Sequence, residues 1–152
     1  INMANGDFKN LPVEFVEHTY PLEVQCYKIR QDSEGAGKYR GGCGVIRQYQ
    51  VETDDCAIGT WFERSVTPAW GLLGGGDAAP PIVVVNPDTP EEKRFLKGAD
   101  MRLKKGSIVR LYTGGGGGYG DPKERSREAV KRDIENGYIS LERARTVYGW
   151  NP

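Results

Sequence analysis

Short apolar stretches rich in β-branched and aromatic residues recur along the first 112 positions, separated by polar or glycine-rich segments. Runs of this length and composition, bounded by turn-forming residues, are typical of β-strands. From Leu22 to Cys26 apolar and polar residues alternate, and Tyr27 and Ile29 then shift the phase, which indicates a bulge or a strand with two packed faces. The pattern predicts strands at residues 13–20, 22–29, 45–51, 57–62, 82–85 and 108–112.

Glycine and proline mark the boundaries of these strands. Glycine clusters at 41–44 and 71–76 can adopt backbone conformations closed to other residues and predict tight loops. Pro80 and Pro81 precede the stretch 82–85, and Pro87 follows it. Because proline lacks a backbone donor and favours extended neighbours, this stretch is predicted to be an edge strand or an interface segment.

After Pro122 the residues become charged and helix-forming, with no β-branched run. Asp121 is placed to cap a helix, with Pro122 in the first position and Glu124 able to reach back as in a capping box. We expect this helix to continue through Ile134 and to end at the Asn-Gly pair 136–137, which supplies a left-handed C-cap.

A second short helix is expected over residues 141–148, capped by Ser140 and ended by Gly149. The sequence thus predicts a mainly β fold, a twisted mixed or antiparallel sheet or a sandwich-like arrangement, with a short C-terminal helical hairpin. The 152 residues suffice for one core. We expect a β-rich domain over residues 1–120 and a helical hairpin over residues 121–152 that packs on it.

Charge and composition exclude several classes of protein. Lysine and arginine number 21, as do aspartate and glutamate, so the chain lacks the basic surplus of a nucleic-acid-binding protein. The longest apolar run, at 82–85, is far shorter than the roughly 20 residues that cross a bilayer. We therefore expect no nucleic acid and no membrane as partners. The chain starts at Ile1 without a charged-then-apolar leader, which indicates a fragment or a processed subunit.

Cysteine and histidine usage argues against a metal site. Cys26, Cys43 and Cys56 are widely spaced and odd in number, which indicates reduced thiols of a cytoplasmic protein and not a disulfide framework or a zinc knuckle. His18 is the only histidine, so this chain alone forms no multi-histidine centre and we expect it to bind no metal. We interpret His18 as a polar strand residue, with a catalytic or metal-binding role as the alternative.

The run TGGGGGYGDP at 113–122 is the most unusual segment. It contains G-x-G-x-x-G, but five consecutive glycines match many patterns, and Asp121 would repel a pyrophosphate at a helix start. A phosphate loop would need Lys and Ser or Thr after the last glycine. Residues without Cβ allow a second backbone, ligand or partner chain to come close; a flexible hairpin tip is the alternative. The candidate substrate or interface residues are Gly115, Gly116, Gly117, Gly118, Tyr119 and Asp121.

A polar loop at 30–40, RQDSEGAGKYR, supplies the other candidates for that site. Arg30, Lys38 and Arg40 are suited to bind a carboxylate or phosphate, because their cationic groups donate hydrogen bonds to such anions. The alternative is a loop held together by an ion pair between Asp32 and Arg40. Both interpretations remain open, and all four residues are carried as substrate or interface candidates.

Three further residues, Glu63, Arg64 and Trp70, flank the turn TPAWGLLGG. An aromatic ring beside glycines either packs into the core or forms the wall of a pocket, and we favour core packing. No catalytic residue can be named from the sequence.

Four separated segments, in this order, resemble the C-terminal region of the hydantoinase B/oxoprolinase family. One departure is Glu34, where the family usually has glycine in this loop. The segments are NLPVEFVEHTYPLEV (10–24), RQDSEGAGKYRGGCGVIRQY (30–49), ER with VTPAWGLLGG (63–75), and TGGGGGYGDPKER with the later EAVKRDIENGYISLERARTVYG (113–149).

The resemblance implies the last part of a larger subunit of an ATP-dependent hydantoinase, 5-oxoprolinase, or acetone or acetophenone carboxylase. Such enzymes use ATP to activate an unreactive oxygen, and then open a cyclic amide with water or carboxylate a ketone. It also implies that ATP and Mg are bound by a hydantoinase A-type partner, that any metal ion lies in the remainder of the complex, and that the N-terminal part of the hydantoinase B-type subunit is a second partner. The alternative is a non-catalytic, β-rich assembly module.

Overall fold

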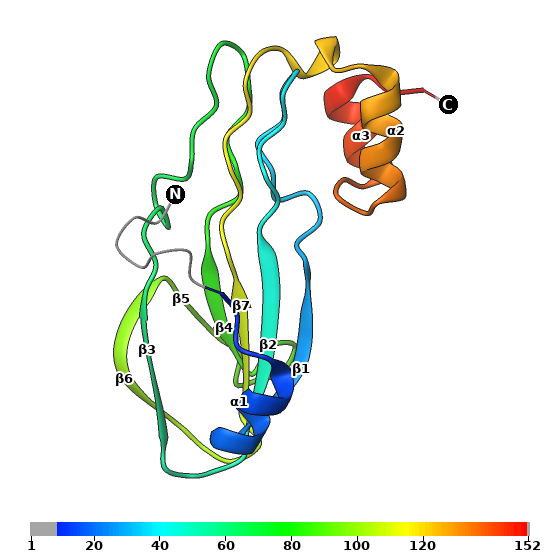
Figure 1. Cartoon of the computed structure of the whole chain (residues 1–152). Helices are drawn as coiled ribbons and strands as arrows, with labels where there is room; N and C mark the ends of the chain where they lie inside the picture. Colours follow the sequence, from blue (N-terminus) through cyan, green and yellow to red (C-terminus); the bar gives the residue numbers. More distant parts are fainter. Residues whose placement is uncertain (1–8, 152) are drawn as a thin grey trace.

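The structure, a computed structural model, describes residues 9–151 (Figure 1). Its strands pair antiparallel, which confirms the mainly β fold with a short C-terminal helical hairpin. The elements in chain order are α1 (Val13–Thr19), β1 (Leu22–Ile29), β2 (Val45–Val51), β3 (Cys56–Trp61), β4 (Ile82–Val85), β5 (Lys93–Phe95), β6 (Lys97–Leu103), β7 (Ile108–Tyr112), the 3-10 turn η1 (Pro122–Glu124), α2 (Arg127–Glu135) and α3 (Leu141–Tyr148).

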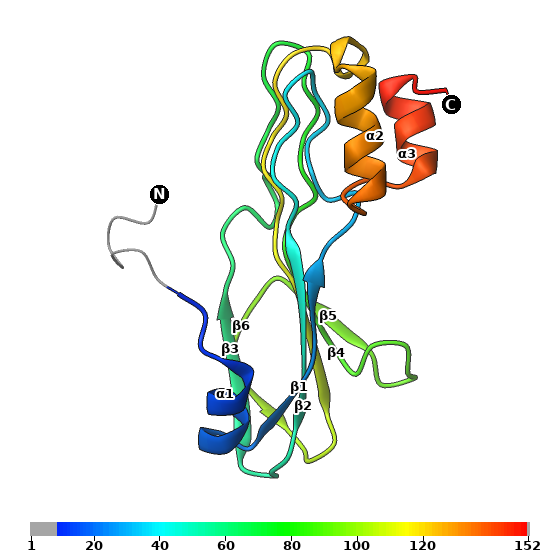
Figure 2. The same ribbon diagram turned by 45° about the vertical axis from the view of Figure 1, so that its right-hand side comes forward.

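Two sheets pack against each other in the lower half of the molecule. The larger has the strand order β1-β2-β7-β4-β5, and the smaller is the two-stranded ribbon β3-β6 (Figure 2). A two-stranded ribbon is marginal by itself, so it depends on packing. Apolar side chains of β2, β4 and β7 meet those of the ribbon and form one core, whose buried residues are Val51, Val83, Val85, Leu103 and Val109.

Strands with a clear alternation of apolar and polar residues lie where the sequence predicts them. The predicted bulge is present as a register shift between Val24 and Cys26. The expected edge position of β4 is wrong, because β4 pairs with both β7 and β5. Strands β5 and β6 were not predicted, since lysine, arginine and aspartate dominate residues 93–103 and hide the inward positions.

The predicted strand at residues 13–20 is wrong, because this stretch forms helix α1. Pro12 precedes the helix and its fixed φ suits a helix start. Val13 and Val16, one helical turn apart, line a cleft with Val24 and Tyr27 of β1. The contact with β1 thus overrides the strand propensity of the valines and phenylalanine.

Three glycine-rich segments extend from the ends of the sheet strands and run side by side in the upper half of the molecule (Figures 1 and 2). We call them together the glycine bundle: residues 33–44, 69–79 and 113–120. Backbone hydrogen bonds join all three segments, for example from Gly35 N to Gly116 O (2.8 Å) and from Gly76 N to Ala36 O (2.7 Å). The bundle therefore brings together the polar loop and the glycine run, the two segments that contain the candidate residues predicted from the sequence.

The C-terminal hairpin differs from its prediction only at its start. Asp121 accepts a hydrogen bond from Lys123 N, but the cap opens only the 3-10 turn η1. Ser126 then caps α2 separately through Ala129 N, so the expected continuous helix is wrong. The end at Gly137 (φ 70°) is as predicted, and so is the second helix α3 between its cap Ser140 and Gly149. The hairpin packs on the glycine bundle through a second core of Ala36, Val130, Ile139, Ala144 and Tyr148.

Candidate functional site

Three of the five amides of the glycine run are engaged inside the bundle. Gly115 N donates to Ala79 O (3.1 Å), Gly116 N to Gly42 O (2.9 Å) and Gly118 N to Gly76 O (3.0 Å). A phosphate-binding loop needs free amides that point at the ligand. The run therefore does not fit the phosphates of ATP, in agreement with the missing Lys and Ser or Thr.

Close backbone contact explains why glycine occupies these positions. A Cβ on Gly41 would overlap Gly116 O, and a Cβ on Gly117 would overlap Trp70 O. The sequence predicts that a second backbone, a ligand or a partner chain approaches these glycines. In the structure, backbones of the same chain do so. The candidates Gly115 and Gly118 are packed in the same way, against Ser33 O and Ala36 O.

The candidate cations of the polar loop do not converge on one point. Arg30 donates to Pro80 O (2.7 Å) and Thr113 O (3.0 Å), and Lys38 pairs with Glu124 (3.1 Å), an ion pair that raises the pKa of Lys38. Arg40 instead stacks on the ring of Tyr138 in the hairpin, 4.8 Å from its centroid. Each cation thus has its own contact within the chain.

The alternative ion pair between Asp32 and Arg40 is not formed. Asp32 Oδ1 accepts from Ser140 N (2.7 Å) at the start of α3. Arg40 Nε lies 2.9 Å from Asp133 Oδ2, at an angle that makes the contact an ion pair and not a hydrogen bond. Arg125 also pairs with Asp133 (2.8 Å). Asp32 and Arg40 therefore tie the loop to the hairpin, and a substrate or interface role for them remains a prediction.

Glu34, the departure from the family pattern, is fully buried and forms the strongest link between the bundle and the hairpin. Arg143 of α3 donates to Glu34 Oε1 (2.6 Å) and to Glu34 O (2.9 Å), and Tyr148 Oη donates to the same Oε1 (3.3 Å). Burial, together with the Glu34 charge, raises the pKa of Tyr148 and keeps its hydroxyl protonated as a donor. Burial opposes the charge of Arg143, but Glu34 outweighs it and raises the pKa of Arg143.

Two aromatic side chains lie exposed at the tip of the bundle. Tyr39 and Tyr119 pair through their backbones and place their ring centroids 6.3 Å apart at 52°. Tyr119 also forms a bridge with Leu72, whose side chain is likewise exposed. The candidate Tyr119 thus holds three chain segments together and faces outward.

Trp70 and Arg64 lie beside an open cleft at the base of the bundle. The side chain of Trp70 is 55% exposed, so the favoured core packing is wrong. Arg64 lines the cleft, and Trp70 lies behind it as the ring on which Arg64 stacks. Arg64 places its guanidinium 4.5 Å from the centroid of the Trp70 ring. Glu63 pairs with Lys97 (2.8 Å), which lowers the pKa of Glu63.

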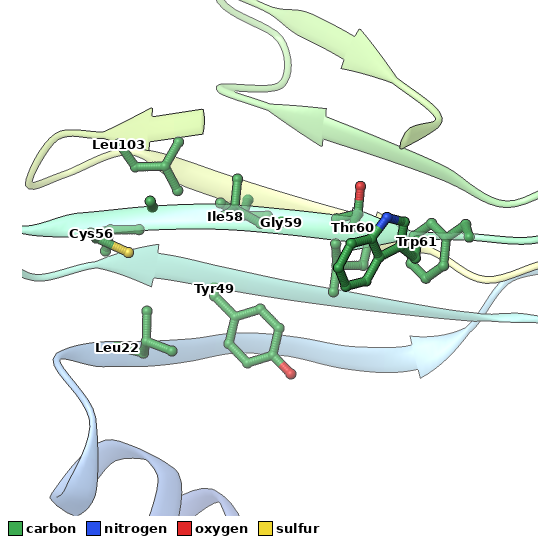
Figure 3. Close-up of a pocket in the computed structure, with 13 residues that line it drawn as sticks. Leu22, Tyr49, Cys56, Ile58, Gly59, Thr60, Trp61 and Leu103 are labelled. Atoms are coloured by element: carbon green, nitrogen blue, oxygen red, sulfur yellow. The ribbon is translucent and has the colours of Figure 1, made fainter. Parts of the chain in front are cut away.

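A larger, apolar groove of about 420 Å³ lies between the ribbon and the five-stranded sheet (Figure 3). Leu22 and Tyr49 lie on its sheet side, and Ile58 and Trp61 of β3 on the other (Figure 3). Trp61 is 85% exposed, unusual for so large an apolar side chain. The groove has the character of an uncovered core, because most of its lining is apolar.

The remaining expectations from the sequence concern His18, grouped metal-binding side chains and membrane-spanning helices. His18 lies exposed in the last turn of α1, and not on a strand as interpreted. Within residues 9–151, no three His, Cys, Asp or Glu side chains are grouped so that they could hold a metal ion. Across the same residues, no helix has the length and apolar composition that crossing a bilayer requires.

Comparison with known sequences shows the family. The sequence model of the hydantoinase B/oxoprolinase family matches residues 1–122, most of the chain. The chain belongs to this family. It is 38% identical to an uncharacterized protein of Methanocaldococcus jannaschii, over 91% of this chain and 24% of that protein, and 33% identical to the B-type subunit of a putative D-/L-hydantoinase from a Pseudomonas species, over 98% and 25%. The chain spans about a quarter of the length of these curated relatives.

Two solved structures share the fold of the hydantoinase B-type chain. Acetone carboxylase in its nucleotide-free form superimposes with a TM-score of 0.75 at 26% identity, over 93% of this chain and 23% of that one. The ATP-dependent caprolactamase of Pseudomonas jessenii superimposes with a TM-score of 0.74 at 27% identity, over 91% and 24%. Both relatives are enzymes, and in both the matching region is again about a quarter of the chain.

Several residues of structural weight carry almost no signal in the sequence. Arg143 and Asp133 have the pattern of ordinary helical residues, although each forms a buried or half-buried ion pair with the polar loop or its neighbours. Their partners lie about a hundred positions away. The only signal was the charge of Glu34 at a position where glycine is usual, since a buried carboxylate requires a cationic partner.

Proposed function

We propose that this chain is the C-terminal part of a subunit of an ATP-dependent enzyme that hydrolyses a cyclic amide or carboxylates a ketone, and that it is not catalytic alone. The observation that carries the proposal is the match of the whole fold to a quarter of an acetone carboxylase and of a caprolactamase. The chain contributes a wall of the reaction chamber. ATP and Mg are bound by the partner subunit, because the glycine run here lacks the Lys and Ser or Thr of a phosphate loop and three of its amides donate to carbonyls of the bundle.

The glycine bundle is a scaffold in this proposal. Its three segments are packed so closely that most added Cβ atoms would meet backbone. Such packing orders flexible residues at a large entropic cost, and what results is a rigid support. The bundle therefore holds the side chains at its base and tip in fixed positions, and these side chains face the remainder of the enzyme.

The apolar groove receives the remainder of the subunit. Curated relatives are about four times as long as the aligned region, so three quarters of a family subunit lies outside this chain. Apolar surface as exposed as Trp61 and the groove beside it is typical of an interface. We assign the groove to an apolar segment of that remaining polypeptide.

Reconstitution tests the proposal. The chain is mixed with the polypeptide that corresponds to the other three quarters of the subunit and with the ATP-binding partner subunit, and ADP release is measured with hydantoin, 5-oxoproline, caprolactam, or acetone with bicarbonate. We expect ADP release that depends on one of these substrates and requires this chain. Full substrate-dependent turnover without the chain would refute the proposal. A complex that assembles with the chain but never turns over would favour the assembly module.

A further inference from the structure

The cleft at the base of the glycine bundle contains an arginine with no partner for its charge among the described residues. Arg64 appears in no ion pair and no side-chain hydrogen bond within residues 9–151; its contact is the face of Trp70, 4.5 Å from the ring centroid. Stacking on an aromatic face fixes the guanidinium plane and leaves the N–H groups at its edge available. Such a group is prepared to bind an oxyanion with two parallel hydrogen bonds.

The backbone at Arg64 is held in an unfavourable conformation. Arg64 has a φ of 60°, in the left-handed region, which costs a residue with a Cβ about 1 kcal/mol or more. The Ser65 hydroxyl donates to Phe62 O (2.9 Å) and stabilises the turn. A strained residue that keeps a large cationic side chain, where glycine would fit better, indicates that the side chain itself is needed.

The cleft beside Arg64 has the size and walls of a small-ligand site. Its volume is about 260 Å³, close to the lower limit of small-molecule pockets. Gly114 and Gly115 line the cleft without side chains, together with Arg64 and Pro81. The Gly114 N–H has no acceptor in the described part of the chain, whereas Gly115 N donates to Ala79 O.

The local charge favours an anion. Glu63 also lines the cleft, but its carboxylate pairs with Lys97 Nζ at 2.8 Å, so these two charges cancel. The guanidinium of Arg64 is left as the net charge of the cleft. A neighbouring carboxylate that neutralised Arg64 would remove this preference, and no such ion pair is formed among residues 9–151.

We propose that the cleft lined by Arg64 and the Gly114–Gly115 backbone binds a small oxyanion, a carboxylate or phosphate group, through the Arg64 guanidinium, which stacks on Trp70. This inference deepens the proposed function, on which any role of the site in turnover rests. Binding itself is a property of this chain and can be measured without the other subunits.

Titration of the full 152-residue chain tests the site. Acetate and inorganic phosphate are added separately at constant ionic strength, and NMR follows the Arg64 Nε–H, the Trp70 indole N–H and the amides of Gly114 and Gly115. We expect saturable shifts confined to this cleft. Saturation by phosphate alone identifies a phosphoryl group as the ligand, and saturation by acetate alone identifies a carboxylate.

Three variants establish which group binds. Arg64→Asn keeps a residue that tolerates the left-handed conformation and should weaken binding about tenfold or more, the loss expected for a charged bidentate pair. Arg64→Lys keeps the positive charge but lacks the two parallel N–H donors of the guanidinium, and it should retain part of the affinity. This variant tests the site even if Arg64→Asn folds poorly. The matched control Arg102→Asn, at an exposed arginine paired with Asp100 and Asp55, should bind as the original chain does.

The outcomes separate this site from the proposed function. Shifts that stay linear with concentration, or that are equal in Arg64→Asn and Arg102→Asn, overturn the site. Saturable binding at Arg64, with turnover of the reconstituted enzyme unaffected by omission of this chain, supports the site and refutes the proposed function instead. Substrate-dependent turnover that requires this chain, without saturable anion binding at Arg64, supports the proposed function and refutes the site.

Discussion

Glu34 shows how a single residue can join two parts of the molecule. Its carboxylate is fully buried, and Arg143 and Tyr148 of the last helix bind it. The second oxygen, Oε2, has no hydrogen-bond partner among the described residues. A buried carboxylate with one free oxygen depends strongly on its remaining partners.

Removal of either partner of this ion pair should destabilise the fold. We expect Glu34→Gln to lower the free energy of unfolding by about 2 kcal/mol, because the Arg143 side chain is a quarter exposed and remains partly solvated. We expect Arg143→Gln to lower it by about 3 kcal/mol, because this change leaves the buried carboxylate unpaired. Urea unfolding of both single variants and the double variant measures the coupling. Strictly additive effects would show that the two residues do not act as a pair.

The exposed pair Lys38–Glu124 provides the control for that measurement. It also links the polar loop to the C-terminal segment, but both side chains are about half exposed. Solvent screening and side-chain entropy leave such pairs little net value. Lys38→Gln should therefore leave the free energy of unfolding almost unchanged. A loss as large as that of Glu34→Gln would mean that any contact between the loop and the hairpin matters equally.

At the scale of the element, the glycine bundle is defined by backbone contacts between segments distant in sequence. Its three segments form neither helix nor sheet, and they are joined by backbone hydrogen bonds such as Gly116 N to Gly42 O (2.9 Å). The sequence indicates that glycine is needed at these positions. It does not predict which backbone segment packs against each glycine, because that contact depends on how all three segments fold together.

Adjacent glycines of the bundle should respond very differently to the same substitution. A Cβ at Gly41 would overlap the carbonyl of Gly116, whereas a Cβ at Gly42 would meet no atom within 4 Å. We expect Gly41→Ala to cost about 3 kcal/mol or to prevent folding, and Gly42→Ala to change stability by less than about 1 kcal/mol. Thermal unfolding of the two variants, with circular dichroism of the folded state, measures this. Equal behaviour of both variants would contradict the packing described for the bundle.

Helices and strands were predictable wherever a local signal governs them. Ser140 and Gly149 delimit α3 in the sequence and in the structure, because a side-chain cap and a left-handed glycine act on neighbouring backbone groups. The sequence predicts a strand in place of helix α1 because its short apolar pattern fits both periods, and the neighbouring β1 decides between them. The break before α2 has a local cap at Ser126 that could have been read from the sequence.

At the scale of the whole molecule, the apolar groove and the oxyanion cleft lie on the surface of a chain that represents a quarter of its relatives. The groove lies between the ribbon and the sheet (Figure 3), and the residues that line the cleft lie where the sheet passes into the bundle. We expect the remainder of the subunit to cover the groove. The two surfaces therefore have different proposed occupants, a polypeptide segment and a small anion.

Covering of the groove can be followed through Trp61. In a chain where Trp70→Phe and Trp150→Phe leave Trp61 as the only tryptophan, its fluorescence should shift to the blue when the remaining polypeptide binds, because the exposed indole leaves water. Trp61→Ala should weaken association by about 2 kcal/mol, as for a central interface residue. Leu141→Asp, at an exposed leucine of the hairpin, is the control and should not change binding. A complex that forms with unchanged Trp61 emission would exclude the groove as the interface.

The sequence by itself determined the strands with clear alternation, the helix caps of the last helix, the positions that require glycine and the family. These rest on interactions between neighbours in the chain or on patterns repeated in relatives. The tertiary structure alone decided which charges pair, as with Glu34 and Arg143, and which aromatic residue stays exposed, as with Trp70. The physical reason is that burial and charge pairing arise between residues as much as 109 positions apart, as with Glu34 and Arg143, and only the folded chain brings these residues together.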